Sequence, residues 1–169
     1  MNKPVFSWST WALLSVYLVI LAGAVVRMTG SGMGCPDWPK CFGYLIPPTE
    51  RSQLDWQPDK NYEKGNVIIL DNNLQVATQT FESGKTIDLQ NWEAYTKHDY
   101  TTFNAIHTWV EFINRLLGAI SGLIVLGLFV RSLWGIRKQH LLSLFSFFAV
   151  VGMGVQAWLG KTVVDSNLL

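Results

Sequence analysis

The sequence predicts an all-α integral membrane protein, a transmembrane helical bundle with three spans and a long outer loop. Only 15% of the 169 residues are charged, whereas ordinary soluble domains carry roughly 25%. No Asp, Glu, Lys or Arg occurs within 4–26, 116–130 or 139–160. A hydrocarbon core of about 30 Å needs roughly 20 apolar residues of helix. These stretches are therefore the candidate spans.

Residues 1–28 are expected to form the first transmembrane helix. The small residues at 22–24 resemble a signal-peptide cleavage site, which is the alternative interpretation. We favour a membrane anchor, because the apolar run continues through Val26 and is longer than a usual signal-peptide core.

The second span is expected at 105–133 and the third at 139–160. The second reaches spanning length only if Glu111 and Arg115 lie within the helix, which then measures roughly 43 Å at about 1.5 Å per residue. Its first turns should protrude beyond the membrane. Residues 161–169 are expected to form an outer loop leading to a fourth helix that this chain does not contain.

The distribution of basic residues predicts the orientation. The link at 131–140 carries three basic residues and no acidic one, which is typical of a cytoplasmic loop. The loop at 29–106 has ten acidic and six basic residues. It should lie outside, with the N-terminus in the cytoplasm.

The outer loop, 29–104, divides into two parts. Its first part is dense in Gly, Pro and aromatic residues, which favours irregular backbone. Cys35 and Cys41 lie there, and a disulfide between them would persist outside the cytosol. From residue 49 onward we expect a small cap of short helices and turns. Val67–Leu70, followed by Asp-Asn-Asn, indicates a short strand or a buried stretch entering a turn.

A polar stripe marks the second span. At 100° per residue, His107, Glu111, Asn114 and Gly118 share one face of the helix, with Arg115 at its flank. Ionisable residues within a span are costly and are functional candidates by default.

Each polar residue has two interpretations. Glu111 could act as a general acid or base, or it could form a structural pair with Arg115 at i, i+4. His107 could be an axial heme or metal ligand, or a solvated histidine at the membrane interface.

The net charge of the chain argues against one class of function: a value of +1 is not that of a nucleic-acid binder.

Three blocks of sequence together resemble the heme A synthase family, specifically its N-terminal half. They are Val26-Arg-Met-Thr-Gly-Ser-Gly with Cys35-Pro-Asp-Trp-Pro-Lys-Cys-Phe-Gly, then Glu111-Phe-Ile-Asn-Arg-Leu-Leu-Gly, then Gln156-Ala-Trp-Leu-Gly-Lys-Thr-Val-Val. The blocks occur in the family's order and bracket most of the chain.

The resemblance implies an eight-helix membrane enzyme that oxidises the C8 methyl of heme O to a formyl group, making heme A for cytochrome c oxidase. Heme B is the implied cofactor and heme O the substrate. Glu111 would be the essential acidic residue, and Cys35 and Cys41 a disulfide. Arg27 and Arg115 are candidates for binding heme propionates, with snorkelling to lipid headgroups as the alternative.

This chain departs from the family at two points. Asn114 stands where the family has a ligand histidine, and an amide is a poor axial ligand compared with imidazole. We expect His107, seven residues earlier on the same face, to serve as the heme iron ligand or to contact the propionates. The second departure is length, and a chain without the remaining helices is expected to be inactive alone.

Two other functions fit the sequence less well. One is a non-enzymatic membrane heme-binding assembly factor, and the other is a quinone-linked thiol oxidoreductase, which normally needs Cys-x-x-Cys. The implied partners are heme O synthase, an electron acceptor or donor protein, and membrane lipid; a homo-oligomer is left open. The implied location is the bacterial plasma membrane or the mitochondrial inner membrane.

Overall fold

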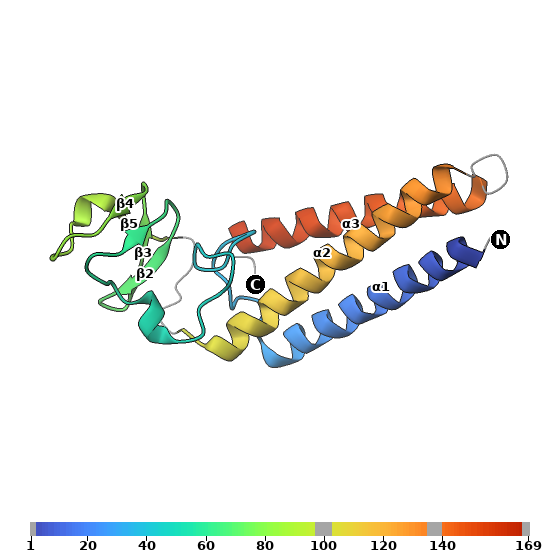
Figure 1. Cartoon of the computed structure of the whole chain (residues 1–169). Coiled ribbons are helices and arrows are strands. Elements are labelled where there is room, and N and C mark those ends of the chain that lie inside the picture. Colours follow the sequence, from blue (N-terminus) through green and yellow to red (C-terminus); the bar gives the residue numbers. More distant parts are fainter. Residues whose placement is uncertain (1–2, 97–102, 135–139, 167–169) are drawn as a thin grey trace. The chain divides into compact units, whose positions relative to one another are not determined.

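The computed structural model describes residues 3–96, 103–134 and 140–166. Three long helices dominate it: α1 (Lys3–Thr29), α2 (Ala105–Leu133) and α3 (His140–Ser166), shown in Figure 1. The chain divides into two units, Met1–Met28 with Ile113–Gly160, and Thr29–Phe112 with Lys161–Leu169. We call the first the helical unit and the second the cap unit.

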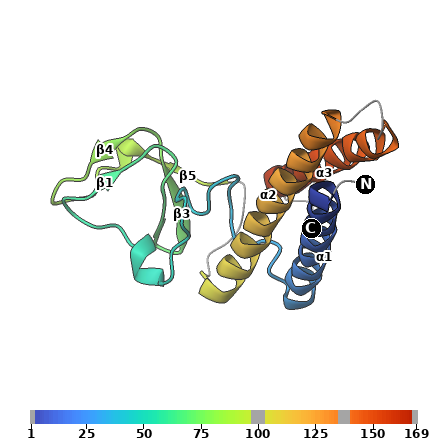
Figure 2. The same ribbon diagram turned by 45° about the vertical axis from the view of Figure 1, so that its right-hand side comes forward.

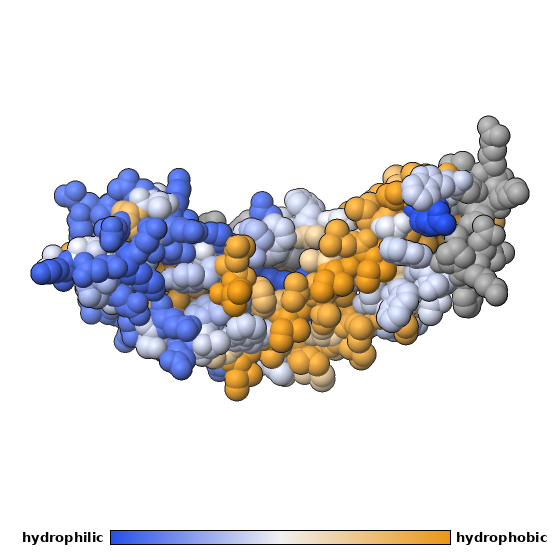
Figure 3. Space-filling model, viewed as in Figure 1, coloured by the Kyte–Doolittle hydropathy of each residue, from blue (hydrophilic) through white to orange (hydrophobic). Residues whose placement is uncertain are grey.

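The helices are long and apolar enough to cross a membrane. The candidate spans are Ser7–Thr29, Ala105–Leu133 and His140–Val164. Most of their large apolar side chains are exposed, and Figure 3 shows a hydrophobic surface over the helical segment. This distribution is the one that a lipid solvent requires, and it confirms the predicted integral membrane helical bundle.

Inside the helical unit, small and hydroxylated residues hold the helices together. Ser15 of α1 and Ser121 of α2 form a hydrogen bond of 3.0 Å between their hydroxyls. The Ser143 hydroxyl of α3 donates to the Ser132 carbonyl of α2 at 3.1 Å. Interhelical hydrogen bonds of this kind, with close packing, drive helix association in a membrane, because the hydrophobic effect does not act between helices in lipid.

The third helix differs from its expected bounds. We expected it to end at residue 160 and an outer loop to follow, but α3 continues to Ser166. The apolar, β-branched segment after Lys161 extends the helical pattern, and Val164 is buried. Among the three basic residues of the 131–140 link, only Arg131 lies within the described residues.

The cap unit contains more strand than the sequence indicated. Antiparallel strands β2 (Val67–Leu70), β3 (Asn73–Ala77) and β5 (Trp92–Ala94) form one sheet, and β1 (Asn61–Tyr62) pairs with β4 (Phe81–Glu82), as Figure 2 shows. The short 3-10 helices η1 (Arg51–Leu54) and η2 (Leu89–Asn91) complete the unit.

The turn between β2 and β3 follows from local chemistry. Asp71 and Asn72 have φ values of 47° and 60°, a left-handed conformation that these two residue types tolerate better than others and that two-residue hairpins require. The strand and turn indicated by Val67–Asn73 are both present.

Each face of the three-stranded sheet carries its own apolar cluster. Val67 and Ile69 pack with Leu54, Leu74, Phe42 and the two cysteines. Ile68 points to the other face and packs with Tyr62, Ala77 and Trp92. This alternation follows from the two-residue period of a strand, and it fixes the loop at 29–43 against the first of these faces.

Candidate functional site

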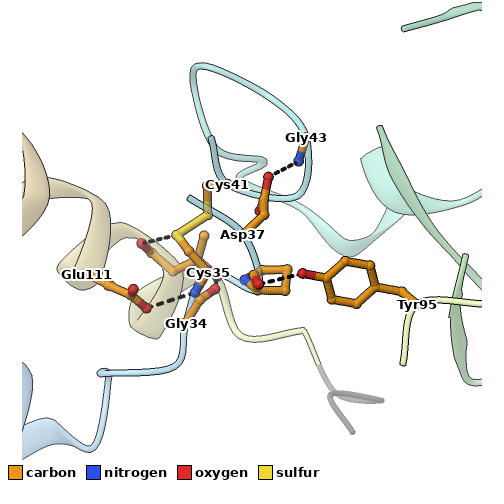
Figure 4. The surroundings of a disulfide bond; sticks show 9 residues. Gly34, Cys35, Asp37, Cys41, Gly43, Tyr95 and Glu111 are labelled. Atoms are coloured by element: carbon orange, nitrogen blue, oxygen red, sulfur yellow. Dashed lines mark hydrogen bonds between the residues drawn. A yellow bond between two sulfur atoms is a disulfide. The ribbon is translucent and has the colours of Figure 1, made fainter. Parts of the chain in front are cut away.

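A short cross-linked loop forms the centre of the candidate site. A disulfide joins Cys35 and Cys41, both only 1% exposed, and their backbones lie 4.8 Å apart at Cα. The Gly43 N–H donates to Asp37 Oδ2 at 2.8 Å, which closes the loop a second time. The disulfide implied by the family resemblance is therefore present, within a tightly folded segment (Figure 4).

The loop docks directly on the first turns of α2. The Cys35 N–H donates to Glu111 Oε2 at 2.8 Å, and the Thr108 hydroxyl donates to the Gly34 carbonyl at 2.9 Å. Figure 4 shows the Glu111 carboxylate beside the disulfide. A hydrogen bond to an ionised carboxylate is shorter and stronger than one between neutral groups.

Gly34 makes this close approach possible. A Cβ at this position would lie 2.3 Å from the His107 carbonyl oxygen. No side chain fits at that distance, so the glycine allows the loop backbone to touch the helix backbone.

Glu111 is therefore buried by the loop. Its side chain is 4% exposed although its carboxylate is polar. The sequence leaves proton chemistry and a structural pair with Arg115 as two interpretations of Glu111, and the structure shows a contact that neither includes, with the loop N–H of Cys35. The carboxylate thus lies shielded from solvent, beside the disulfide.

His107 lies one turn earlier on α2 and is held by a chain of hydroxyls. Its Nδ1 lies 2.8 Å from Ser31 Oγ, and Ser31 Oγ lies 2.6 Å from Thr29 Oγ1. When Nδ1 donates its proton to Ser31, Nε2 carries the lone pair that a metal requires. Hydrogen bonding of the second ring nitrogen is the usual way that a ligand histidine is oriented.

A cavity of about 270 Å³ lies beside His107. Four apolar side chains line it, Met33, Phe42, Ile69 and Phe103, together with the polar residues Asn104, His107 and Thr108. Phe42 and Phe103 meet edge to face with ring centroids 5.6 Å apart. The cavity therefore combines apolar side chains with an imidazole, the side chain that most often ligates heme iron, and with two other polar residues.

The remaining predicted site residues belong to the helical unit. Asn114 lies on α2 with its Oδ1 buried and without a hydrogen-bond partner among the described residues. This oxygen would be 3.9 Å from a Cβ at Gly23 of α1. Arg115 is partly buried on α2, and Arg27 is exposed in the last turn of α1.

Sequence reasoning did not single out Ser31, Gly34 or Thr108. Ser31 is completely buried; Ser31 and Gly34 contact the first turns of α2, and Thr108 lies in those turns and donates to Gly34. The Thr-Gly-Ser-Gly run before Cys35 was the available signal, because small residues beside a cysteine loop permit close backbone approach.

The buried disulfide disfavours thiol exchange. A redox-active pair must expose one sulfur to an attacking thiolate, whereas both cysteines here are buried. Within the described part of the chain no group of three or more His, Cys, Asp or Glu residues could hold a metal ion.

Comparison with known proteins places these features in a family. The model of the cytochrome oxidase assembly protein family matches residues 6–81 and 73–169. The heme A synthase of Nitrosomonas eutropha is 28% identical over 169 residues, which is 99% of this chain and 40% of the relative. The heme A synthase of Flavobacterium psychrophilum is 27% identical over 169 residues, 99% of this chain and 42% of the relative.

Over a shorter stretch of the chain the sequence identity is higher. The heme A synthase of Shewanella oneidensis is 45% identical over 49 residues, 27% of this chain and 15% of the relative. No solved structure matches. The chain spans about two fifths of the length of the relatives that it matches from end to end. From the family match over nearly its whole length, the chain belongs to the cytochrome oxidase assembly protein family.

Proposed function

We propose that this chain is the N-terminal part of a heme A synthase, which oxidises the C8 methyl of heme O to a formyl group. The observation that carries the proposal is the pairing of a buried Glu111, held by the Cys35 N–H, with a His107 cavity one turn away. Several full-length relatives of the family are named heme A synthase.

The proposed reaction converts a methyl group and water into a formyl group, four protons and four electrons. A bound heme B would accept the electrons one at a time, which is chemistry that the protein itself does not supply. This chain's residues bind and orient the substrate and move its protons.

His107 is the residue that would hold a heme iron in this part of the protein. Its Nδ1 contact with Ser31 orients the ring, and four apolar side chains line the cavity beside it. A cavity of about 270 Å³ is slightly below the roughly 300–1,000 Å³ usual for small-molecule sites. It would therefore hold one edge of the macrocycle, with Arg27 or Arg115 as the candidate partner of a propionate.

Glu111 is the residue that would take protons from the reacting methyl group at its carboxylate. The loop on which Cys35 lies excludes bulk water from it. A carboxylate in a shielded site can exchange a proton with the substrate without competition from solvent. Asn114, in the place of the family's histidine, would not ligate iron but would line the bundle next to α1.

The protein is an integral membrane protein, and we propose its orientation from charge. The cap unit would face the outside of a bacterial plasma membrane or mitochondrial inner membrane, where the disulfide persists. Heme O synthase would supply the substrate, and an electron-transfer protein would be needed to remove electrons.

A chimera tests the activity. The N-terminal two fifths of the Nitrosomonas eutropha enzyme would be replaced by this chain, in cells that make heme O but lack heme A synthase. We expect heme A in extracted membranes, and none with Glu111→Gln, while Glu93→Gln, an exposed carboxylate on the cap, should leave heme A unchanged.

Heme binding by the chain itself provides a second measurement. We expect a low-spin spectrum after titration with heme, lost in His107→Ala and retained in His140→Ala. A chimera that closes its disulfide and binds heme O yet forms no heme A would contradict the synthase proposal and favour a heme-binding assembly factor. Heme binding that survives His107→Ala would remove His107 from the ligand set.

A further inference from the structure

A second cavity, of about 390 Å³, lies in the cap unit. Its wall comes from four parts of the chain: Tyr44 with residues 46–49, Gln53 of η1, Lys60 before β1, and Trp109 in the second turn of α2. None of the residues that line it carries a carboxylate. The heme proposal makes no use of this cavity.

Two of the lining side chains contain buried donors that nothing in the described part of the chain satisfies. They are the Tyr44 hydroxyl and the Trp109 Nε1. Buried polar atoms in native proteins nearly always have a partner, so an unpaired one calls for an explanation such as a missing ligand. Burial raises the pKa of Tyr44 to about 12, so the phenol stays protonated and can donate at neutral pH.

Lys60 adds a positive charge to the same cavity. Its ammonium lies 6.0 Å from the ring centroid of Tyr44 and 5.2 Å from that of Tyr62. Desolvation by burial lowers its pKa. Among the described residues, no carboxylate lies within ion-pair distance of Lys60. The Tyr44 hydroxyl, the Trp109 Nε1 and the Lys60 ammonium thus offer three hydrogen-bond donors at this cavity, whereas the Gln53 Oε1 already accepts the Thr49 N–H.

The surroundings indicate where an acceptor would come from. Trp109 lies near the outer end of a helix of 29 residues, which is longer than the roughly 20 residues that the hydrocarbon core needs. Tryptophan at such a position marks the level of the lipid headgroups. Leu45 and Ile46, beside the cavity, are 75% and 71% exposed, although they are large and apolar.

We propose that this cavity binds the headgroup phosphate of an anionic phospholipid, through donors from Tyr44, Lys60 and Trp109. The exposed Leu45 and Ile46 would lie along the acyl chains. The inference goes beyond the proposed heme chemistry and does not depend on it. A lipid held there would tie the cap to the membrane surface.

Native mass spectrometry of the full chain in a neutral detergent tests the proposal. Phosphatidylglycerol and phosphatidylcholine would be titrated separately, and we expect tighter binding of phosphatidylglycerol. Lys60→Gln removes a charge-assisted hydrogen bond and should weaken that binding about tenfold. Tyr44→Phe and Trp109→Phe should each weaken it by severalfold.

Matched controls separate this cavity from general charge attraction. Lys85→Gln removes an exposed cap charge, and Trp56→Phe removes an unpaired indole N–H outside the cavity; neither should change lipid binding. Tyr44→Phe keeps the aromatic ring and deletes a buried unpaired hydroxyl, so it should melt no lower than wild type without lipid.

Three results would overturn the assignment. The first is equal binding of the two lipids, and the second is equal loss in Lys60→Gln and Lys85→Gln. The third is displacement of phosphatidylglycerol by metal-free protoporphyrin, whose propionates are the other acceptors that the cavity could take. Metal-free porphyrin avoids any contribution from iron ligation at His107.

Discussion

The Glu111 carboxylate accepts the Cys35 N–H, so substitutions there separate its structural contact from its proposed proton transfer. Glu111→Ala leaves a buried N–H without an acceptor, which costs about 1–3 kcal/mol. Glu111→Gln keeps an acceptor oxygen and should lose clearly less stability, although it can no longer carry a proton. Denaturant unfolding of the chain in detergent measures the difference. Wild-type stability in Glu111→Ala would show that the loop does not depend on this bond.

Gly34 permits the contact between the loop and α2 by lacking a side chain. A Cβ at this position would lie 2.3 Å from the His107 carbonyl oxygen, which is a backbone atom and cannot turn away as a side chain could. Gly34→Ala must therefore separate the loop from the helix, at a cost of about 1–3 kcal/mol. Gly84→Ala is the control, because its nearest neighbour would be 4.0 Å away. Thermal melting of both variants in one detergent compares them; equal melting temperatures would argue against the contact.

We predict that the folded chain loses stability at alkaline pH as Tyr44 ionises. Its pKa rises from 10.0 to about 12 through burial, so the folded chain holds this proton more tightly than the unfolded chain does. The stabilisation is complete below pH 10 and is lost as pH rises through about 12. Tyr44→Phe should lose less stability between pH 10 and 12 than wild type. Unfolding followed by circular dichroism at several pH values measures this, and parallel losses would contradict it.

The residues of the candidate site were predictable to different degrees. Glu111 and His107 stand out because charged or imidazole side chains are rare in an apolar span. Ser31 and Gly34 could not be chosen from sequence, because their roles depend on how an irregular loop folds back onto α2. Hydropathy and spacing carry no information on that path.

At the scale of elements, η1 supports the cap core through a single leucine. Leu54 is completely buried against Val67, Ile69 and the cysteine loop. Leu54→Ala should cost about 2–5 kcal/mol, as expected for a large-to-small core change. Leu45→Ala, at a leucine that is 75% exposed, is the matched control. Limited trypsin digestion at the cap lysines reports the effect, and equal digestion rates would place Leu54 outside the stabilising core.

The long helices follow from sequence more directly than the cap does. An uninterrupted apolar run can satisfy its backbone in lipid only as a helix, so length and charge gaps suffice. The observed α2 has the expected bounds, 105–133. The cap strands have two to five residues each. Such short segments depend on partners distant in sequence, and only the Val-Ile-Ile-Leu run carried a local signal.

For the whole molecule, the apolar surface of the helical unit and the polar cap require opposite solvents. The proposed side of the cap rests first on charge: basic residues gather in the 131–140 link, and the 29–106 loop is acidic. The disulfide also supports a location of the cap outside the cytosol, because the cytosol would reduce it. Both arguments support the proposed location of the cap outside the membrane, and they rest on different residues.

Cysteine labelling in intact cells tests this orientation. Both native cysteines are consumed by the disulfide, so an introduced thiol can be read alone. Lys85→Cys, on the exposed surface of the cap, should react with a membrane-impermeant maleimide in intact cells. His140→Cys, exposed at the first residue of α3, should react only after the membrane is permeabilised. The reverse pattern would place the cap in the cytoplasm, where the disulfide would be reduced and the loop that shields Glu111 would lose its cross-link.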